Sequence, residues 1–496
     1  MSASQPPPPV ETCDVCIVGA GIAGLNALFA ASRYLSRDNK VILIDRRPRV
    51  GGMWVDVYPY VRLHQPHPMF TAGNIAWTIG KDRAYLATKG EVLEHFQHCV
   101  DVIRERVQVD EYLGWDSESE EEANGIVRIT ARAADGRMLV VEAKRLIKAF
   151  GLGITPNEPL DMSSTRVHSV SPDYCDVRTG AISECDAPVW IIGGGKTAMD
   201  TAHALITANP GREVNLVAGH GTFFSKRDSL LPSGTGRWWK GAPPSAVATR
   251  LSHRYDGTNE SDVQGWYRAT HGTFLTPQAD NFVLGVLSEA ENRTISAGLN
   301  DVVMDYFEDA VDRNDTTELV FRSGSTKTIQ PGSWVVNCTG YVKFPDEDSY
   351  EPYVSRSGAV VSINVRSAVL HLPAFMGYFL GHLMFLDKLS EIPLYEVDWQ
   401  KLRQKAPLAF PYVLFALVQH NLSLIYDEVP RSVFSENGLD FDKWYPLPRR
   451  LPGLARFVLT HRRECERQRR VLDTVRERFD IRCGPLGEEY APSVTT

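Results

Sequence analysis

Short apolar runs that end in glycine-rich turns occur at two places along the chain. The first run, 15–18, has strand character and enters Gly19-Ala20-Gly21-Ile22-Ala23-Gly24, followed by a helical stretch over 25–35. A second apolar run, 41–44, ends at Asp45. Strand, glycine turn, helix, strand and terminal acid within about 30 residues is the pattern of a dinucleotide-binding unit.

Each glycine of this first fingerprint has a predicted task. Gly19 permits the tight turn, Gly21 lets the backbone approach a pyrophosphate, and Gly24 lets the helix pack on the sheet. The pyrophosphate would lie on the positive N-terminal end of the helix. Asp45 is predicted to accept hydrogen bonds from a ribose hydroxyl.

A second fingerprint follows later in the chain. The apolar run 189–192 enters Gly193-Gly194-Gly195-Lys196-Thr197-Ala198, and a helical stretch and another strand come next. The two outer glycines and Ala198 match the G-x-G-x-x-A form of the fingerprint. A Walker A loop is excluded, because that motif needs a glycine where Trp190 stands.

The strand after the second fingerprint lacks a terminal acid. It ends at Ala218-Gly219-His220, and Lys226 and Arg227 follow. An acid at this place favours NAD, whereas cations favour the 2′-phosphate of NADP. His220, Lys226 and Arg227 therefore predict NADPH; the alternative for the last two is that they are ordinary surface charges.

The remaining patterns predict how the chain is divided. Segments between 106 and 150 form a β-meander, with the acidic run 116–122 in a solvated connection. The strand 333–336 and the following Asn337-Cys338-Thr339-Gly340-Tyr341 are expected to return the chain to the first domain. The Arg-rich tail 448–480 is expected to be a solvated helix.

Composition narrows the class of protein. The 496 residues include 61 acidic and 53 basic side chains, which gives a net charge of -8. The basic surface of a nucleic-acid binder is therefore not expected. The apolar stretches 368–386 and 408–418 are interrupted and fall short of the ~20 residues that span a bilayer. They predict buried core helices and no transmembrane segment; shallow membrane attachment or an apolar substrate tunnel stays open. The start resembles no signal peptide, which favours a cytoplasmic location.

The cysteines predict neither a scaffold nor a metal site. Eight are too few for a disulfide framework in a chain this long, and they show no metal-ligand spacing. Cys13 and Cys16 form the C-x-x-C pair of disulfide reductases, but within a strand this spacing directs them to opposite faces. We therefore expect no redox pair.

Two fingerprints in one chain imply two nucleotides that face each other. A tightly held flavin and a diffusing nicotinamide are the economical pair, because hydride passes readily between them. The expected fold class is α/β, with two Rossmann-like dinucleotide-binding domains, the NADPH domain inserted into the FAD domain, and a helical C-terminal extension. The predicted boundaries are a disordered Pro-rich start at 1–12, an FAD domain at 13–170 and 331–390, an NADPH domain at 171–330 with an insertion at about 233–299, and the extension at 391–496.

At this point the sequence resembles the class B flavin-dependent monooxygenases, over roughly 14–341. Gly51-Gly52-Met53-Trp54 is similar to the family's segment beside the flavin, residues 58–70 to the stretch that lines its reactive face, and Cys338-Thr339-Gly340-Tyr341 to its linker. The family's identifying motif survives only as Val167-His168-Ser169 with a displaced Tyr174. His168 is expected to position the linker.

The resemblance implies an FAD-dependent, NADPH-consuming monooxygenase. Such an enzyme forms a flavin C4a-(hydro)peroxide and transfers one oxygen atom from O2 to a small organic, lipophilic substrate, with N- or S-oxygenation favoured. The alternatives are a Baeyer–Villiger monooxygenase, a non-oxygenating FAD/NADPH oxidoreductase, and a nucleotide-binding regulator. A homo-oligomer is left open.

His64 and its neighbour Gln65 are the predicted catalytic residues. An imidazole with a near-neutral pKa can hold or release a proton at the oxidant, and a structural histidine is the alternative. The predicted cofactor-binding residues of the two sites are Gly19, Gly21, Gly24, Asp45, Gly52, Met53, Trp54, Leu63, His64, Gly193, Gly195, Lys196, Thr197, Ala198, His220, Lys226, Arg227, Thr339 and Gly340.

Overall fold

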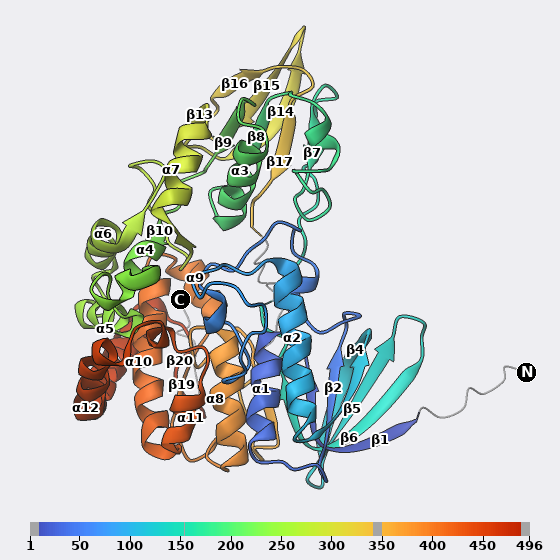
Figure 1. The fold of residues 1–496 in the computed structure, drawn as a ribbon, viewed down its shortest axis with the longest axis vertical. Coiled ribbons are helices and arrows are strands. Elements are labelled where there is room, and N and C mark those ends of the chain that lie inside the picture. The colour runs from blue at the N-terminus through green and yellow to red at the C-terminus, as the bar shows by residue number, and fades with distance from the viewer. Residues whose placement is uncertain (1–8, 153, 341–349, 488–496) are drawn as a thin grey trace, which may run out of the picture.

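A seven-stranded sheet carries the first fingerprint (Figure 1). The structure is a computed structural model that describes residues 9–152, 154–340 and 350–487. The strand order is β3-β2-β1-β6-β5-β4, with β18 paired to β6. The strands are β1 (Val10–Val18), β2 (Lys40–Asp45), β3 (Gln108–Leu113), β4 (Trp115–Ala123), β5 (Ile126–Ala133), β6 (Met138–Lys148) and β18 (Val360–Ser362). Strands β1, β2, β3 and β6 are parallel, whereas β4, β5 and β6 form the antiparallel meander.

Helices α1 (Ile22–Ser32), α2 (Lys89–Arg104) and α8 (Pro373–Phe385) accompany this sheet. Helix α8 approaches α1 closely because Gly377 has no side chain: a Cβ there would lie 2.1 Å from the carbonyl oxygen of Ala23. The contact brings a helix from the last third of the chain against the helix of the first fingerprint. The first domain is therefore completed by residues that follow the second domain.

The second fingerprint belongs to a separate five-stranded sheet of order β13-β9-β8-β17-β7. Its strands are β7 (His168–Val170), β8 (Val189–Ile192), β9 (Val214–Val217), β13 (Asp301–Val303) and β17 (Trp334–Asn337), with helices α3 (Lys196–Ala208) and α7 (Glu289–Gly298). A three-stranded sheet of β14 (Phe307–Arg313), β15 (Thr316–Phe321) and β16 (Thr326–Ile329) lies beside it (Figure 1).

The return to the first domain occurs later than the sequence predicts. The strand expected to return, β17, pairs with β8 and β7 in the second sheet, so that prediction is wrong. The returning strand is β18, whose Val361 pairs with Ile147 of β6. Both strands are short and buried, so apolar character alone does not tell which sheet receives each one.

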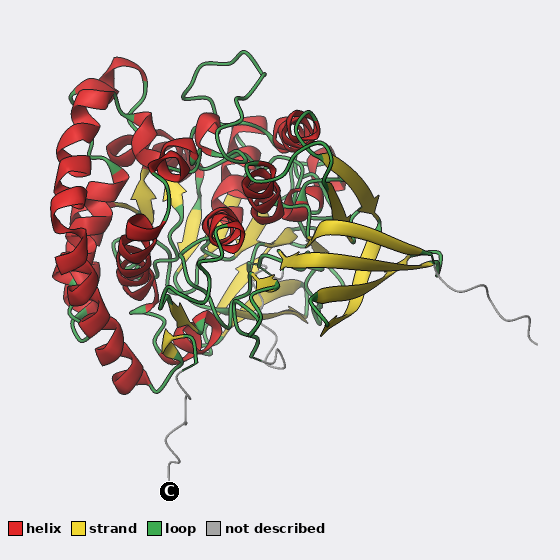
Figure 2. Ribbon diagram, turned by 90° about the horizontal axis from the view of Figure 1, so that it is seen from below, coloured by secondary structure: helices red, strands yellow, loops and turns green. Residues whose placement is uncertain are grey.

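The insertion and the C-terminal extension pack together. Before the insertion come β10 (Phe224–Lys226) and α4 (Arg227–Leu230), and the insertion itself holds α5 (Pro244–Arg254), α6 (Glu260–His271), β11 (Gly272–Thr273) and β12 (Val286–Leu287). The extension holds β19 (Tyr395–Val397), α9 (Trp399–Lys405), α10 (Phe410–Glu428), α11 (Arg431–Glu436), α12 (Leu447–Phe479) and β20 (Cys483–Pro485). In Figure 1, α5 lies against α10 and α12, and in Figure 2 the long α12 forms one outer edge of the molecule.

Two further predictions about local structure need correction. Residues 10–12 are part of β1 and are not disordered, while residues 1–8 lie outside the described residues. The acidic run 116–122 lies in strand β4, not in a loop, although its side chains are mostly exposed as expected. Arg132 of β5 forms an ion pair with Glu118 of β4, and this cross-strand pair offsets part of the like charge.

The apolar stretches of the last third are helices of the core. They correspond to α8 and α10, most of whose side chains are buried, as predicted. In the part of the chain that the structure describes, no helix is both long and apolar enough to cross a membrane.

Candidate functional site

One large cavity extends from the first glycine turn to the C-terminal helices. Its volume is about 1810 Å³, well above the roughly 300–1,000 Å³ of an ordinary small-molecule pocket. Gly21 and Asp45 line one end of it, and Phe457 lines the other. The cavity therefore has room for a dinucleotide and a further molecule.

The first fingerprint shapes a backbone cradle at the start of α1. Gly19 has φ +110°, and a Cβ at Gly24 would lie 1.7 Å from the carbonyl oxygen of Gly19, so the turn and the helix touch directly. Gly21 is the N-cap of α1, and within the described residues no side chain caps its amides. The free N–H groups of the first turn and the helix dipole make this end of α1 attractive to an anion.

A second glycine pair narrows the cradle from the opposite side. Gly52 has φ +54°, and a Cβ there would lie 2.7 Å from Cα of Gly21. Met53 and Trp54 follow in a short helical turn and line the cavity, and Trp54 packs against Phe70 with ring centroids 5.8 Å apart. A cleft between two bare backbones fits a pyrophosphate, so the residues present fit a dinucleotide such as FAD.

Asp45 is fixed at the edge of this cradle. Its carboxylate accepts a 2.6 Å hydrogen bond from the amide of Ala20 and a 2.8 Å hydrogen bond from the amide of Arg47. The side chain is buried yet lines the cavity. Each carboxylate oxygen retains a further lone pair, which leaves acceptors for a ribose hydroxyl.

The second fingerprint repeats the cradle at the start of α3. A Cβ at Gly193 would lie 2.3 Å from the carbonyl oxygen of Cys338, whereas a Cβ at Gly195 would meet none of the described atoms within 4 Å. Gly195 is the N-cap of α3, so the open space lies at the positive end of that helix. Lys196 and Thr197 of the first turn line the cavity described above.

The two domains meet at the segment that carries His64. The hydroxyl of Tyr58 donates a 2.7 Å hydrogen bond to Asp200, which also forms an ion pair with Lys196. Arg227 Nε donates a 2.7 Å hydrogen bond to the carbonyl oxygen of His64. These contacts hold the backbone of the His64 segment against α3 and α4.

The His64 ring is neutral at physiological pH. Burial, and then the charge of Lys196, lower the pKa of His64 to about 4. This differs from the near-neutral pKa expected from the sequence, because the sequence does not show the burial or the nearby lysine. A neutral imidazole donates one hydrogen bond and accepts one, which suits it to hold a partner at a fixed place.

The basic residues after the second fingerprint are already engaged. Lys226 forms a 2.9 Å ion pair with Glu289, and Arg227 forms a 2.8 Å ion pair with Glu291, at the start of α7. The side chain of His220 is 67% exposed beyond the end of β9. The predicted role of all three cations at a 2′-phosphate stays a prediction.

Another cation lies close to the end of β9. The ring of His220 is 5.4 Å from the ring of Tyr306, and the guanidinium of Arg322 lies 4.3 Å from the centroid of the same tyrosine ring. A Cβ at Gly219 would lie 3.0 Å from this tyrosine ring. Arg322 follows β15, far from the fingerprint in sequence, so the motif gives no hint of it.

The predicted site residues separate into two groups. The cavity gathers Gly19, Gly21, Asp45, Gly52, Met53, Trp54, Leu63, His64, Gln65, Lys196 and Thr197 along its wall. Outside its lining lie Gly24, Gly193, Gly195, Ala198, His220, Lys226, Arg227, Thr339 and Gly340. Several of the second group act as backbone or packing positions, as Gly24 and Gly193 do.

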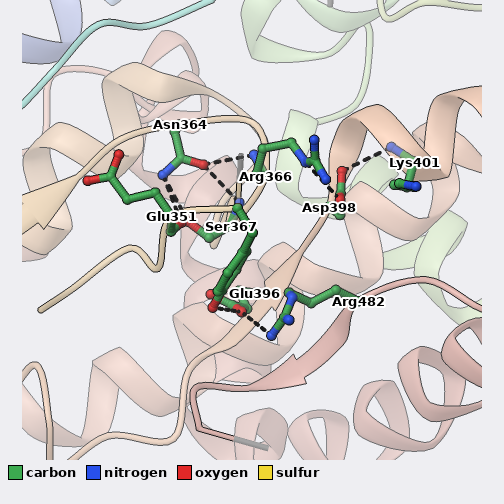
Figure 3. A network of polar contacts seen from close by, with 9 residues as sticks. Glu351, Asn364, Arg366, Ser367, Glu396, Asp398, Lys401 and Arg482 are labelled. Atoms are coloured by element: carbon green, nitrogen blue, oxygen red, sulfur yellow. Dashed lines mark hydrogen bonds and ion pairs between the residues drawn. The ribbon is translucent and has the colours of Figure 1, made fainter. Parts of the chain in front are cut away.

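The segment after β18 lines the cavity and was not predicted. Asn364 fixes it, because its side-chain oxygen accepts hydrogen bonds of 2.8 Å and 3.0 Å from the amides of Arg366 and Ser367 (Figure 3). Arg366 Nε donates a 2.9 Å hydrogen bond to Asp398, which caps α9 through the amide of Lys401. The network ties the returning segment to the C-terminal extension.

The far end of the cavity is an apolar chamber, and its wall includes Phe415 of the stretch 408–418, for which the sequence left an apolar substrate tunnel open. Its walls come from α5, α10, α11 and α12, and they include Val247, Phe415, Leu422, Tyr426, Phe434 and Phe457. We call this part the C-terminal chamber. Because its residues are spread over 200 positions of the chain, no local motif marks it.

The C-x-x-C pair does not form a redox site. Cys13 and Cys16 are both buried and free. Burial raises the pKa of the Cys13 thiol to about 12 and that of Cys16 well above its ordinary value. Thiols of this kind are poor nucleophiles, so the burial argues against a redox pair. The expectation that the two cysteines point to opposite faces is wrong, because both pack into the same apolar cluster with Val18.

Comparisons with known proteins match this picture over part of the chain. Residues 13–230 match the model of a family described as pyridine nucleotide-disulphide oxidoreductase. A ferredoxin–NADP reductase of Paraburkholderia phytofirmans is 29% identical over 239 residues, which are 47% of this chain and 58% of that protein. An uncharacterised protein of Mycobacterium tuberculosis is 33% identical over 97 residues, 18% of this chain, and the match covers 17% of its length.

Among solved structures, cyclohexanone monooxygenase bound to cyclohexanone is similar with a TM-score of 0.49 and 13% identity, over 82% of this chain and 94% of that one. The two glycine cradles and the parallel sheets that carry them agree with the family match. Residues 13–230 thus resemble the pyridine nucleotide-disulphide oxidoreductase family, in a chain that carries two glycine cradles on two separate parallel sheets.

Proposed function

We propose that this chain is an FAD- and NADPH-dependent monooxygenase that transfers one oxygen atom of O2 to a small lipophilic substrate. The observation that carries the proposal is the single cavity of about 1810 Å³. It joins the first glycine cradle, the His64 segment at the domain interface, and the C-terminal chamber. A reductase that passes electrons to another protein needs no such buried apolar chamber.

The chain's own residues divide the binding task. The cradle of Gly19, Gly21 and Gly52 would hold the pyrophosphate of FAD, and Asp45 would hold a ribose hydroxyl. The start of α3 would hold the pyrophosphate of NADPH at Gly195. When bound, the flavin supplies hydride acceptance from nicotinamide and the activation of O2.

His64 would act as a neutral hydrogen-bond donor beside the reacting centre. Its low pKa keeps the ring uncharged, so a positive charge does not form there at neutral pH. Arg227 is a positioning residue in this scheme, because it holds the His64 backbone through a 2.7 Å hydrogen bond. The buried walls of Trp54, Leu63 and Ile363 would keep bulk water from the same region.

The finer choice among oxygen acceptors stays a prediction. N- or S-oxygenation is favoured over Baeyer–Villiger chemistry by the His64 segment, at a point where members of the latter group usually carry an aspartate. A non-oxygenating FAD/NADPH oxidoreductase on this fold is the competing function. It differs in one measurable respect: NADPH oxidation would never be accompanied by an oxygenated product.

The decisive experiment follows NADPH consumption and product mass together. The FAD-loaded protein is screened with lipophilic amines, sulfides and ketones, and we expect at least one to gain a single oxygen atom in step with NADPH oxidation. As a matched variant, Ala248→Phe narrows the C-terminal chamber away from both cradles. It should weaken substrate oxygenation while FAD content and basal NADPH oxidation persist.

Two results would count against the proposal. One is NADPH oxidation that yields only hydrogen peroxide with every substrate class. The other is an Ala248→Phe variant that oxygenates a large substrate as well as the unaltered protein does, since that would separate the chamber from the reaction.

A further inference from the structure

The N-terminal half of α12 presents apolar side chains to the outside. Leu447, Leu451, Leu454 and Val458 are 57%, 52%, 47% and 47% exposed, and their spacing places them on one face of the helix. Leu459, at 83%, extends this face. Contiguous exposed apolar surface on a folded protein marks a site of contact with a partner or a membrane.

Two tryptophans adjoin this helix. Trp238 and Trp239 are 50% and 67% exposed. Arg449 of α12 donates hydrogen bonds to the carbonyl oxygens of Lys240, at 2.5 Å, and Gly241, at 2.8 Å, which fixes the tryptophan segment beside the start of the helix. We call these two tryptophans and the five exposed residues of α12 the α12 face.

The charge around the α12 face is positive, although the whole chain is acidic. Residues 447–463 contain five arginines and no acid, and the tryptophans are flanked by Arg237 and Lys240, in a chain of net charge -8. Two of these arginines have acidic partners on other elements: Arg450 lies 3.7 Å from Asp440, and Arg462 lies 3.0 Å from Asp427. Arg462 remains 80% exposed in spite of this contact.

We propose that the α12 face docks the protein on the surface of an anionic lipid membrane. An amphipathic helix with apolar residues on one side and arginines beside them lies in the plane of the interface between headgroups and acyl chains. Tryptophan is enriched at that depth, where its ring is apolar and its N–H is polar. The excess of arginine and lysine attracts anionic headgroups.

A second copy of the chain fits this face less well. Pairing two α12 faces would bring two sets of arginines together without acids from the same segments, and like charges at an interface oppose association. A membrane of anionic lipid supplies the opposite charge for the arginines and an apolar layer for the leucines.

The inner side of the same helix segment faces the C-terminal chamber. Gly453, Phe457 and Thr460 line the cavity, and Leu454 of the α12 face lines it as well. Docking through the α12 face would therefore place the chamber next to the bilayer, where lipophilic molecules concentrate. This consequence rests on the proposed monooxygenase function, whereas membrane docking itself does not.

Vesicle flotation of the FAD-loaded full chain tests the docking. With phosphatidylcholine vesicles that contain 30% phosphatidylserine, we expect the protein to float at low salt and to be released at about 1 M salt, where charges are screened within ~3 Å. Pure phosphatidylcholine should bind far less. A Trp239→Ser/Leu451→Ser/Leu459→Ser variant should lose binding by about tenfold or more, because it removes inserted apolar surface.

Two matched variants separate the face from general effects. Val10→Ser/Ile126→Ser removes exposed apolar side chains from the first sheet, at the opposite end of the molecule (Figure 1), and should float normally. Lys240→Gln/Arg463→Gln should bind more weakly and with a smaller salt dependence. All variants should keep their FAD content and their NADPH oxidation without vesicles, which shows that they fold.

Three outcomes would overturn the proposal: no flotation with phosphatidylserine, flotation unchanged in the triple variant, or a dimer in solution that the triple variant dissociates while vesicles stay unbound. The last result would make the α12 face an interface between copies. A protein that floats as expected but oxygenates no substrate would leave docking intact and contradict the proposed function.

Discussion

Arg227 provides the sharpest test of how the site is built, because two roles for it predict opposite kinetics. As a ligand of the NADPH 2′-phosphate, it would discriminate NADPH from NADH. As a positioning residue, it holds the His64 carbonyl at 2.7 Å and pairs with Glu291 at 2.8 Å. We expect the second role, and Arg227→Gln is the perturbation.

The size of the stability effect follows from the burial of the pair. The Arg227 and Glu291 side chains are 12% and 25% exposed. Burial alone would raise the pKa of Glu291, yet Arg227, Lys196 and the capping bonds from Ser288 hold it at about 2. Losing a charge-assisted hydrogen bond and leaving a partly buried carboxylate without its nearest cation costs about 3 kcal/mol. At about 2.1 cal/mol/K of unfolding entropy per residue over 496 residues, this lowers the melting temperature by roughly 3 °C.

The assay measures kcat/KM for NADPH and for NADH, together with hydrogen peroxide release and thermal unfolding. For Arg227→Gln we expect both nucleotides to lose efficiency alike, with more peroxide per NADPH because the His64 segment is no longer held. In the Arg227→Gln/Glu291→Gln double variant, part of the lost stability should return, since no carboxylate remains unpaired.

Lys226→Gln is the matched control, because its pair with Glu289 is more exposed, at 29% and 46%. It should cost no more than about 1 kcal/mol. A selective loss of NADPH relative to NADH in Arg227→Gln, with unchanged peroxide release, would refute the positioning role and support the 2′-phosphate prediction.

Further predictions concern the cradle, the nucleotide preference, acid stability and thiol reactivity. Gly52→Val should purify without bound flavin by its absorbance spectrum, because even a Cβ would lie 2.7 Å from Gly21; Gly80→Val, where the described residues leave open space, should retain it. Arg322→Ala should lower the preference for NADPH over NADH severalfold in kcat/KM, because the Arg322 guanidinium stacks on Tyr306 beside the end of β9, where the 2′-phosphate is expected. Burial lowers the pKa of His382 to about 4. Between about pH 6.5 and pH 4 the unfolded chain therefore binds a proton at His382 that the folded chain does not bind, so the free energy of unfolding falls as the pH falls. Melting curves should show that His382 contributes about 3 kcal/mol to this loss, and that His382→Gln reduces it. Cys185, exposed and with a pKa lowered by its hydrogen bond to Trp334, should be the cysteine that a thiol reagent labels first, as peptide mass mapping can show.

The sequence predicts best where local chemistry and backbone geometry coincide. Both fingerprints could be located because a glycine is needed wherever two backbones touch, as at Gly24 and Gly193. The helices and strands beside them follow from apolar runs of the right length. The acid at Asp45 lies in the cavity wall as the spacing predicts.

Residues whose role depends on distant partners could not be predicted in the same way. The pKa of His64 depends on burial and on Lys196, which lies in the other domain. Lys226 and Arg227 look like free cations in the sequence, and their glutamate partners are more than 60 positions away. Strand β17 is as apolar as a returning strand, so its true sheet is decided by pairing and not by composition.

The insertion and the C-terminal extension form one packed unit through contacts between distant segments. Trp444 donates a 2.8 Å hydrogen bond to the carbonyl oxygen of Pro232, and His253 lies 2.6 Å from Glu464 across the same boundary. Both contacts join segments that are separated by about 200 residues, and the C-terminal chamber lies between them. A change of substrate size should therefore require matched changes in α5 and α12. A smaller side chain on one helix enlarges the chamber but leaves the side chain opposite it on the other helix without its packing partner. If so, exchanging either segment alone with that of a relative should lower stability, and exchanging both should restore it.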